Sequence, residues 1–164
     1  DLSVNPRMDY RALGGPSFAA YDTTPFFFGA RRRLLEVPCS TDYTGMAGSF
    51  APALHRAISH PALASTRIVG VMSRLGVVNK IMLSPEGSSL GDMKALTRSL
   101  LQRGVRTFSL TLHSPSMKPG CTPYVRTQAD LGRFLDRVAA YCDFFLSEVN
   151  GVSSTPEDFL EYLA

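Results

Sequence analysis

Short strand-type runs alternate with longer helical patterns along this chain, and this alternation constrains the fold more than any other feature of the sequence. Three runs have strand character: residues 34–38, which end at a proline, residues 80–84, and the alternating, β-rich residues 106–112. Residues 50–60 and 61–75, between the first two runs, have helical character. Strands separated by helices predict parallel βαβ units with right-handed crossovers, so the expected fold class is α/β.

Two of the later helices have clear start signals. Ser89 is followed three residues later by Asp92, and Thr127 is followed in the same way by Asp130. Each pair is a variant of the capping box, in which two side chains satisfy the free N–H groups at the start of a helix. The expected helices cover residues 90–103 and 128–149, with a last short helix from residue 156.

Residues 1–32 have no sustained period and are rich in glycine, proline and aromatic residues. We expect an irregular segment there, whose aromatic side chains pack onto a neighbouring surface, since long loops in compact domains are often functional. The 164-residue length fits one domain, so residues 1–164 are expected to form a single α/β domain or the C-terminal fragment of a larger one.

Composition excludes several classes of protein. Hydrophobic residues make up 45% and charged residues 19%, which is typical of a globular protein and not of a disordered one. The net charge is only +3 and the one basic run is Arg31–Arg33, so no nucleic-acid partner is expected. No apolar run approaches the roughly 20 residues of a membrane helix, and no signal peptide is visible. Three widely spaced cysteines predict reduced thiols. A cytoplasmic, bacterial protein without a membrane partner is expected.

His113 is the strongest candidate for chemistry. It directly follows the expected strand at residues 106–112, and the carboxyl ends of parallel strands are where function collects in α/β folds. An imidazole at this position can act as a general acid or base near neutral pH. The alternative is a histidine that is hydrogen-bonded within its own loop. Glu86, after residues 80–84, is the only acidic residue in a post-strand loop with some promise.

The turn-rich residues 119–126 contain two further candidates. Tyr124 could stack on a sugar ring, and Arg126 could bind an anion. The alternative is that Tyr124 holds the loop together and that Arg126 pairs with Asp130. His55 and His60 are five residues apart, which is not the spacing of a helical metal site, so no metal ligands are expected.

Residues 110–116, Leu-Thr-Leu-His-Ser-Pro-Ser, are followed by Pro-Gly at 119–120 and Thr-Pro-Tyr-Val-Arg at 122–126. This stretch resembles the last motif of polysaccharide deacetylase-like proteins with the NodB-homology fold, of the carbohydrate esterase family 4 type. Residues 34–38 are similar to a late strand of that family, and Asp-Leu-Ser-Val at 1–4 is similar to the Asp-Ser-Ser-Val that precedes it. The resemblance covers most of the chain, as the C-terminal half of a distorted (β/α) barrel.

The resemblance implies an activity and a set of site residues. Members of the family remove acetyl groups from N-acetylated sugars in polysaccharides, using a divalent metal, usually zinc, which an Asp-His-His site holds. A second Asp activates a metal-bound water, and a late His protonates the leaving amine. By motif match, His113 would be that catalytic acid and Leu110 would form part of the pocket for the acetyl methyl group. Tyr124 and Arg126 would lie near the substrate.

The sequence also departs from the family. The paired-aspartate motif, the His-x-x-x-His motif and the arginine motif are absent from these 164 residues. We therefore expect no cofactor in this chain, a divalent metal such as zinc in a full-length parent, and no deacetylation by the chain alone. The expected partners are a glycan substrate and either a further copy of the chain or the N-terminal half of the fold. The alternative function is a non-catalytic carbohydrate- or partner-binding module, with Phe26, Phe27 and Phe28 as its interface.

Overall fold

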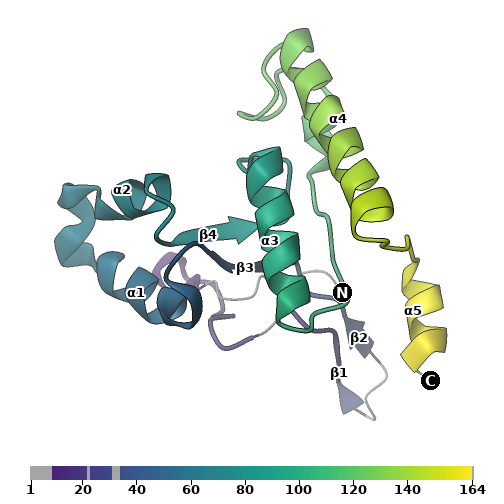
Figure 1. The fold of residues 1–164 in the computed structure, drawn as a ribbon, viewed down its shortest axis with the longest axis horizontal. Helices are drawn as coiled ribbons and strands as arrows, with labels where there is room; N and C mark the ends of the chain where they lie inside the picture. Colours follow the sequence, from purple (N-terminus) through teal and green to yellow (C-terminus); the bar gives the residue numbers. More distant parts are fainter. Residues whose placement is uncertain (1–8, 22, 31–33, 164) are drawn as a thin grey trace.

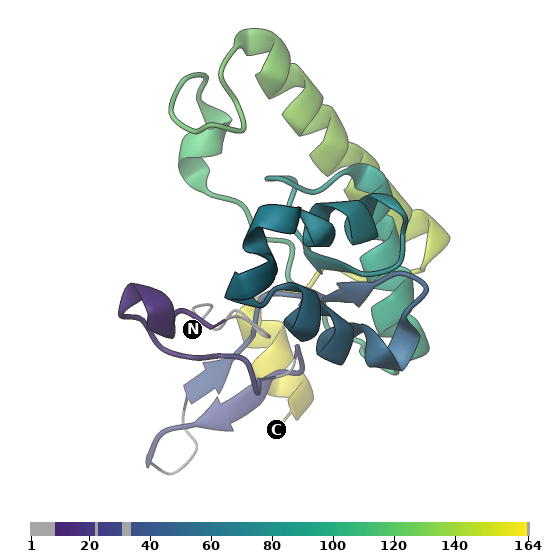
Figure 2. The ribbon, with the colours of Figure 1, turned by 90° about the vertical axis from the view of Figure 1, so that its left-hand side faces the viewer.

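A computed structural model describes residues 9–21, 23–30 and 34–163 of the chain, and it shows a mixed α/β fold with two small antiparallel sheets. The strands are β1 (Phe26–Phe28), β2 (Leu34–Glu36), β3 (Thr41–Thr44) and β4 (Asn79–Met82), and the helices are α1 (Ala51–Ile58), α2 (Ile68–Arg74), α3 (Leu90–Gln102), α4 (Gln128–Asp143) and α5 (Pro156–Leu163). Helices α1 and α2 lie at one end of the molecule and α4 at the other, with α3 between them (Figure 1). Figure 2 shows the ribbon from the side of α1 and α2. Shorter turns are the 3-10 turns Arg11–Leu13, Gly48–Phe50, η4 (Pro61–Thr66) and η5 (Ser114–Met117), and the π-helical turn η6 (Phe144–Glu148).

The expected parallel βαβ units are not formed by the described strands, because both strand pairs are antiparallel. Strand β1 pairs with β2, and β3 pairs with β4 with Thr41 opposite Met82. The connection that contains α1 and α2 begins and ends at neighbouring positions, because Met46 N, before α1, donates to the Gly76 carbonyl oxygen, after α2, at 2.9 Å. The two helices therefore act as a long hairpin connection, and β4 must return alongside β3 in the opposite direction.

A glycine is required where this hairpin closes. Gly45 has a φ of 114°, and a Cβ atom at this position would lie 2.7 Å from the carbonyl oxygens of both Gly76 and Val77. Contacts this short between a side-chain carbon and a backbone oxygen are not tolerated, so the close approach of the two chain segments depends on the missing side chain.

The expected third strand, residues 106–112, is extended but belongs to no sheet. Thr111 N donates to the Leu83 carbonyl oxygen at 3.1 Å, which places the segment beside the end of β4. A parallel ladder at Thr111 would also need an N–H at residue 85, which is Pro85. Ser40 connects the two segments instead. Its carbonyl oxygen accepts a hydrogen bond from Leu83 N, and its Oγ accepts one from Ser109 N, each at 2.8 Å.

Both predicted capping boxes are confirmed. Asp92 N donates to Ser89 Oγ at 3.1 Å and Ser89 N donates to an Asp92 carboxylate oxygen at 3.2 Å, at the start of α3. The same reciprocal pair joins Asp130 and Thr127 at the start of α4, at 3.1 and 2.9 Å. The two capping-box pairs in the sequence therefore predict correctly where α3 and α4 begin.

Helix ends and interruptions differ from the expectation. The helix expected to reach residue 149 is α-helical only to Asp143 and continues as the π-helical turn η6. The rings of Phe144 and Phe145, three and four residues after Tyr141, both lie against the ring of Tyr141. The helix expected at residues 61–75 divides into η4 and α2, because Arg67 between them has a left-handed backbone with a φ of 54°.

The aromatic residues of the N-terminal segment pack on one another. Ring contacts with centroid distances of 5.5 to 6.2 Å run from Tyr10 through Phe18 and Tyr21 to Phe26. The segment is also less irregular than expected, since it contains β1. The Arg31–Arg33 run and the motif at residues 1–4 lie outside the described residues.

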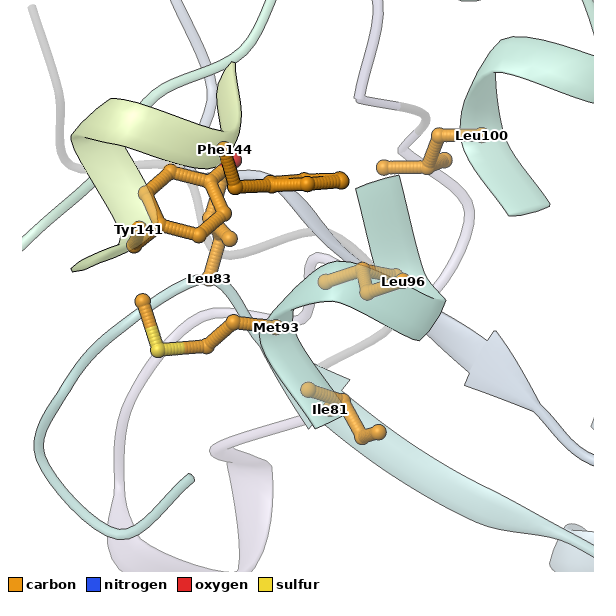
Figure 3. Close-up of a cluster of buried hydrophobic side chains, with 7 residues drawn as sticks. All are labelled: Ile81, Leu83, Met93, Leu96, Leu100, Tyr141 and Phe144. Atoms are coloured by element: carbon orange, nitrogen blue, oxygen red, sulfur yellow. The ribbon is translucent and has the colours of Figure 1, made fainter. Parts of the chain in front are cut away.

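The main hydrophobic core lies between β4, α3 and the end of α4 with η6. Figure 3 shows its buried side chains, Ile81, Leu83, Met93, Leu96, Leu100, Tyr141 and Phe144. Within it, the Thr97 hydroxyl donates to the Met93 carbonyl oxygen at 3.0 Å, so the Tyr141 hydroxyl donates to Thr97 Oγ1 at 2.8 Å. Burial raises the pKa of Tyr141 to about 12. Cys142 is exposed, because Tyr141 and Phe144 occupy the inward positions of this helix.

Candidate functional site

Glu86 lies in the turn that follows β4, and this turn is fixed from two sides. Its backbone N–H donates to Ser84 Oγ at 3.1 Å. From α4, Arg137 Nη1 donates to the Pro85 carbonyl oxygen at 2.6 Å. The Glu86 side chain is only 4% exposed, so its carboxylate is held in a fixed, largely dry position.

The loop after residues 106–112 places three hydrogen-bond donors on the Glu86 carboxylate. His113 Nδ1 lies 2.5 Å from Oε2, and His113 N donates to Oε1 at 3.0 Å. Ser116, which is fully buried in η5, donates its hydroxyl to Oε1 as well. Thr122 Oγ1 lies 3.1 Å from Ser116 Oγ and completes the network. The structure thus joins the two post-strand candidates of the sequence, Glu86 and His113, in one site.

The charge of Glu86 decides the protonation of its partners. Burial alone would raise the pKa of this carboxyl group, but hydrogen bonds from Ser116 and His113 outweigh burial and hold the pKa below its ordinary value. The group is therefore an ionised carboxylate near neutral pH, which can only accept hydrogen bonds. It follows that His113 carries a proton on Nδ1, and that Nε2 is the ring nitrogen left for other chemistry. The His113 side chain is 75% exposed, so its ring is accessible from solvent.

Ser116 is not arranged as a nucleophile. Because its hydroxyl hydrogen points at Glu86, the Thr122 hydroxyl must donate to Ser116 Oγ. A nucleophilic serine would instead donate to the imidazole that activates it. Sequence reasoning missed both Ser116 and Thr122. Their only signal was membership of the same turn-rich loop as His113, and hydroxyl residues in loops are too common to single out.

Tyr124 lies beside this network. A Cβ atom at Gly87, the residue after Glu86, would come 3.8 Å from Tyr124 Cε1, which places the ring over the Glu86 turn. The Tyr124 side chain is also half-exposed. The structure therefore brings a phenol ring with a free surface to the same side of the molecule as His113.

Arg126 and Leu110 are not brought into the network. Arg126 Nε donates to the Pro123 carbonyl oxygen at 3.3 Å, and it is the Arg126 backbone N–H, rather than its guanidinium, that meets Asp130. Asp130 forms its ion pair with Arg133. Leu110 packs against the main core and lines a separate hollow of about 500 Å³, whose lining includes neither Glu86 nor His113.

In the part of the chain that the structure describes, the side chains do not form a site for a resident divalent metal. Across residues 9–21, 23–30 and 34–163 no group of three or more His, Cys, Asp or Glu side chains could hold a metal ion. His55 and His60, the other two histidines, bond locally to Ser59 Oγ and Ala62 N. The zinc that the family resemblance implies has no ligand set in this part of the chain.

No protein-family model matches the sequence, and no curated protein and no solved structure matches it either. Among the helices of the described residues, none is both long and apolar enough to cross a bilayer.

Proposed function

We propose that this chain supplies the acid–base histidine of a glycan N-deacetylase, with His113 as the proton donor and Glu86 as the residue that orients it. The observation that supports the proposal is an exposed imidazole fixed through Nδ1 on a buried, ionised carboxylate. The substrate class comes from the resemblance of residues 110–116 and 122–126 to the last motif of the deacetylase family. The parallel barrel implied by that resemblance is part of the same proposal.

In amide hydrolysis the carbon–nitrogen bond of the tetrahedral intermediate breaks only when the leaving nitrogen is protonated. A protonated His113 would donate the proton from Nε2 to that nitrogen, so that a free amine and acetate leave. Glu86 acts through His113: its carboxylate holds Nδ1 and fixes the ring orientation, so that Nε2 faces the substrate side.

Tyr124 is proposed to bind the sugar. Its half-exposed ring lies over the Glu86 turn, and an aromatic face is a suitable surface for the apolar face of a pyranose ring. Arg126, in the same loop, is proposed to contact polar groups of a longer glycan. The role of Leu110 in a pocket for the acetyl methyl group stays a prediction, since its hollow is separate from His113.

The test uses the protein encoded by the complete reading frame that contains this sequence, supplied with zinc. Acetate release from N-acetylglucosamine oligomers is measured for the wild type and for His113→Gln, with His55→Gln as the matched control. Loss of a general acid should lower kcat by about 100-fold or more, while the control stays at the wild-type rate. A wild-type kcat for His113→Gln would refute the role of His113.

A second candidate, a carbohydrate-binding module without catalysis, is favoured by one observation. Phe27 and Phe28 on β1 are partly exposed beside the ring cluster that contains Tyr21 and Phe26. Titration of the chain with N-acetylglucosamine oligomers in the absence of metal separates the two functions. Binding that Phe28→Ala weakens and His113→Gln leaves unchanged would replace the catalytic proposal by the binding one.

A further inference from the structure

The extended residues 106–112 belong to no sheet of the described residues, but they run beside the end of β4 and form an outer edge there. On one side, the backbone N–H groups bond inward: Ser109 to Ser40 Oγ at 2.8 Å, Thr111 to the Leu83 carbonyl oxygen at 3.1 Å, and His113 to the Glu86 carboxylate at 3.0 Å. These donors are two residues apart. Because consecutive N–H groups of an extended chain point to opposite sides, the N–H groups of the residues between them face away from the molecule's interior strands.

The outward groups belong to Phe108, Leu110 and Leu112. Within the described ranges none of these three N–H groups has a hydrogen-bond acceptor. A row of unpaired backbone groups on an extended segment is a template for a further strand. Natural edges are usually protected by charge or proline, yet residues 107–112, Thr-Phe-Ser-Leu-Thr-Leu, contain no charged residue, no proline and no glycine.

The hollow of about 500 Å³ lies next to this edge. Residues 106–110 line it, together with Phe145, Leu146, Val152 and Phe159. Val152 is 79% exposed, and Leu146 and Leu112 are partly exposed as well. An added strand would therefore find hydrogen-bond partners along the edge and apolar surface beside it.

We propose that the occupant is the same segment of a second copy of this chain, paired antiparallel through residues 107–112 to form a two-fold dimer. Antiparallel pairing is self-complementary, because each copy offers the same alternating donors and acceptors to the other. The neutral segment brings no like charges together. The two flanking residues that can be charged, Arg106 and His113, lie at opposite ends, so antiparallel pairing keeps the two Arg106 side chains apart.

Sedimentation equilibrium over a range of protein concentrations tests the proposal, with Leu112→Pro as the variant. Proline removes an outward N–H without removing any inward hydrogen bond, so the monomer should stay folded while the dimer is lost. Leu112→Ala keeps the N–H and is the matched control, which should dimerise. Leu112→Lys is a second blocking variant, because lysine on an edge opposes pairing. Far-ultraviolet circular dichroism checks that each variant is folded.

Amide hydrogen exchange gives a residue-level test. Exchange at Phe108, Leu110 and Leu112 should slow as the protein concentration rises, while exchange at Ser109 and Thr111 should stay the same. A wild-type monomer at every concentration would overturn the proposal, and so would a dimer that Leu112→Pro leaves intact. Slow exchange at the three outward positions in the monomer would also overturn it, since another segment of the same chain would then cover the edge.

Discussion

Replacing Glu86 by glutamine tests the reasoning behind the site most directly, because it removes the charge and keeps the shape. The carboxylate accepts hydrogen bonds from His113 Nδ1, His113 N and Ser116 Oγ. A hydrogen bond to a charged group contributes about 1.5 to 3 kcal/mol. Solvent screens most of the energy of the hydrogen bond between Glu86 and the exposed His113 imidazole, and the glutamine side chain keeps one acceptor oxygen. We therefore expect Glu86→Gln to lower the free energy of unfolding by about 2 kcal/mol at pH 7.

The pH dependence separates this explanation from simple misfolding. Since the pKa of Glu86 is lowered in the fold, its ionised form stabilises the protein above the ordinary glutamate pKa of about 4.3. That contribution is lost as the pH falls through the lowered pKa, because protonated Glu86 resembles glutamine. The difference in free energy between wild type and Glu86→Gln should therefore be full at pH 7 and shrink towards acid pH.

Urea unfolding at a series of pH values measures this difference, and the exposed Glu161→Gln serves as the control. Nitrogen-15 spectra of the imidazole provide a second readout, since His113 should carry its proton on Nδ1 in the wild type and lose that preference in Glu86→Gln. Equal stability of the two proteins at pH 7, or a difference that does not change with pH, would refute the account of the site.

Two further predictions concern the scaffold. Thr97→Val removes the acceptor of the buried Tyr141 hydroxyl, so the free energy of unfolding should fall by about 1 to 3 kcal/mol in urea, and Thr97→Ser should restore most of it. Absorbance titration of the wild type should show one tyrosine ionising near pH 12, as the pKa of Tyr141 requires. Thr127→Ala removes the cap of α4 and should cost about 1 kcal/mol, measured by thermal unfolding; a loss no larger than that of Ser154→Ala, an exposed loop residue, would contradict the capping assignment.

Local signals in the sequence predicted the local structure well. The starts of α3 and α4 follow from Ser89 with Asp92 and Thr127 with Asp130, since each pair satisfies backbone groups within one turn. Strand β3 was not predicted, because Thr41 and Asp42 are polar residues that the fold buries. The buried charge of Asp42 is compensated by an ion pair with Arg103 at 2.9 Å. That partner is far away in the sequence, so nothing near β3 indicates a strand.

The direction of the strands also depends on distant contacts. Parallel units were predicted because helices separate the strand-type runs, and this argument assumes that each crossover leads to the next strand of one sheet. Here Gly45 meets Gly76 and Val77 and turns the crossover into a hairpin. For the site, position after a strand identified Glu86 and His113, but their pairing across the fold could only come from the structure.

The π-helical turn Phe144–Glu148 absorbs one residue of chain length next to the main core. The turn contains one more residue than an α-helical turn would need. Deleting the exposed Ser147 would remove no buried side chain, and it would restore α-helical spacing. The residues on either side of the turn would keep their places, including those that line the hollow beside residues 106–110. A lineage could thus gain or lose one residue here by a single-codon change without rebuilding that hollow.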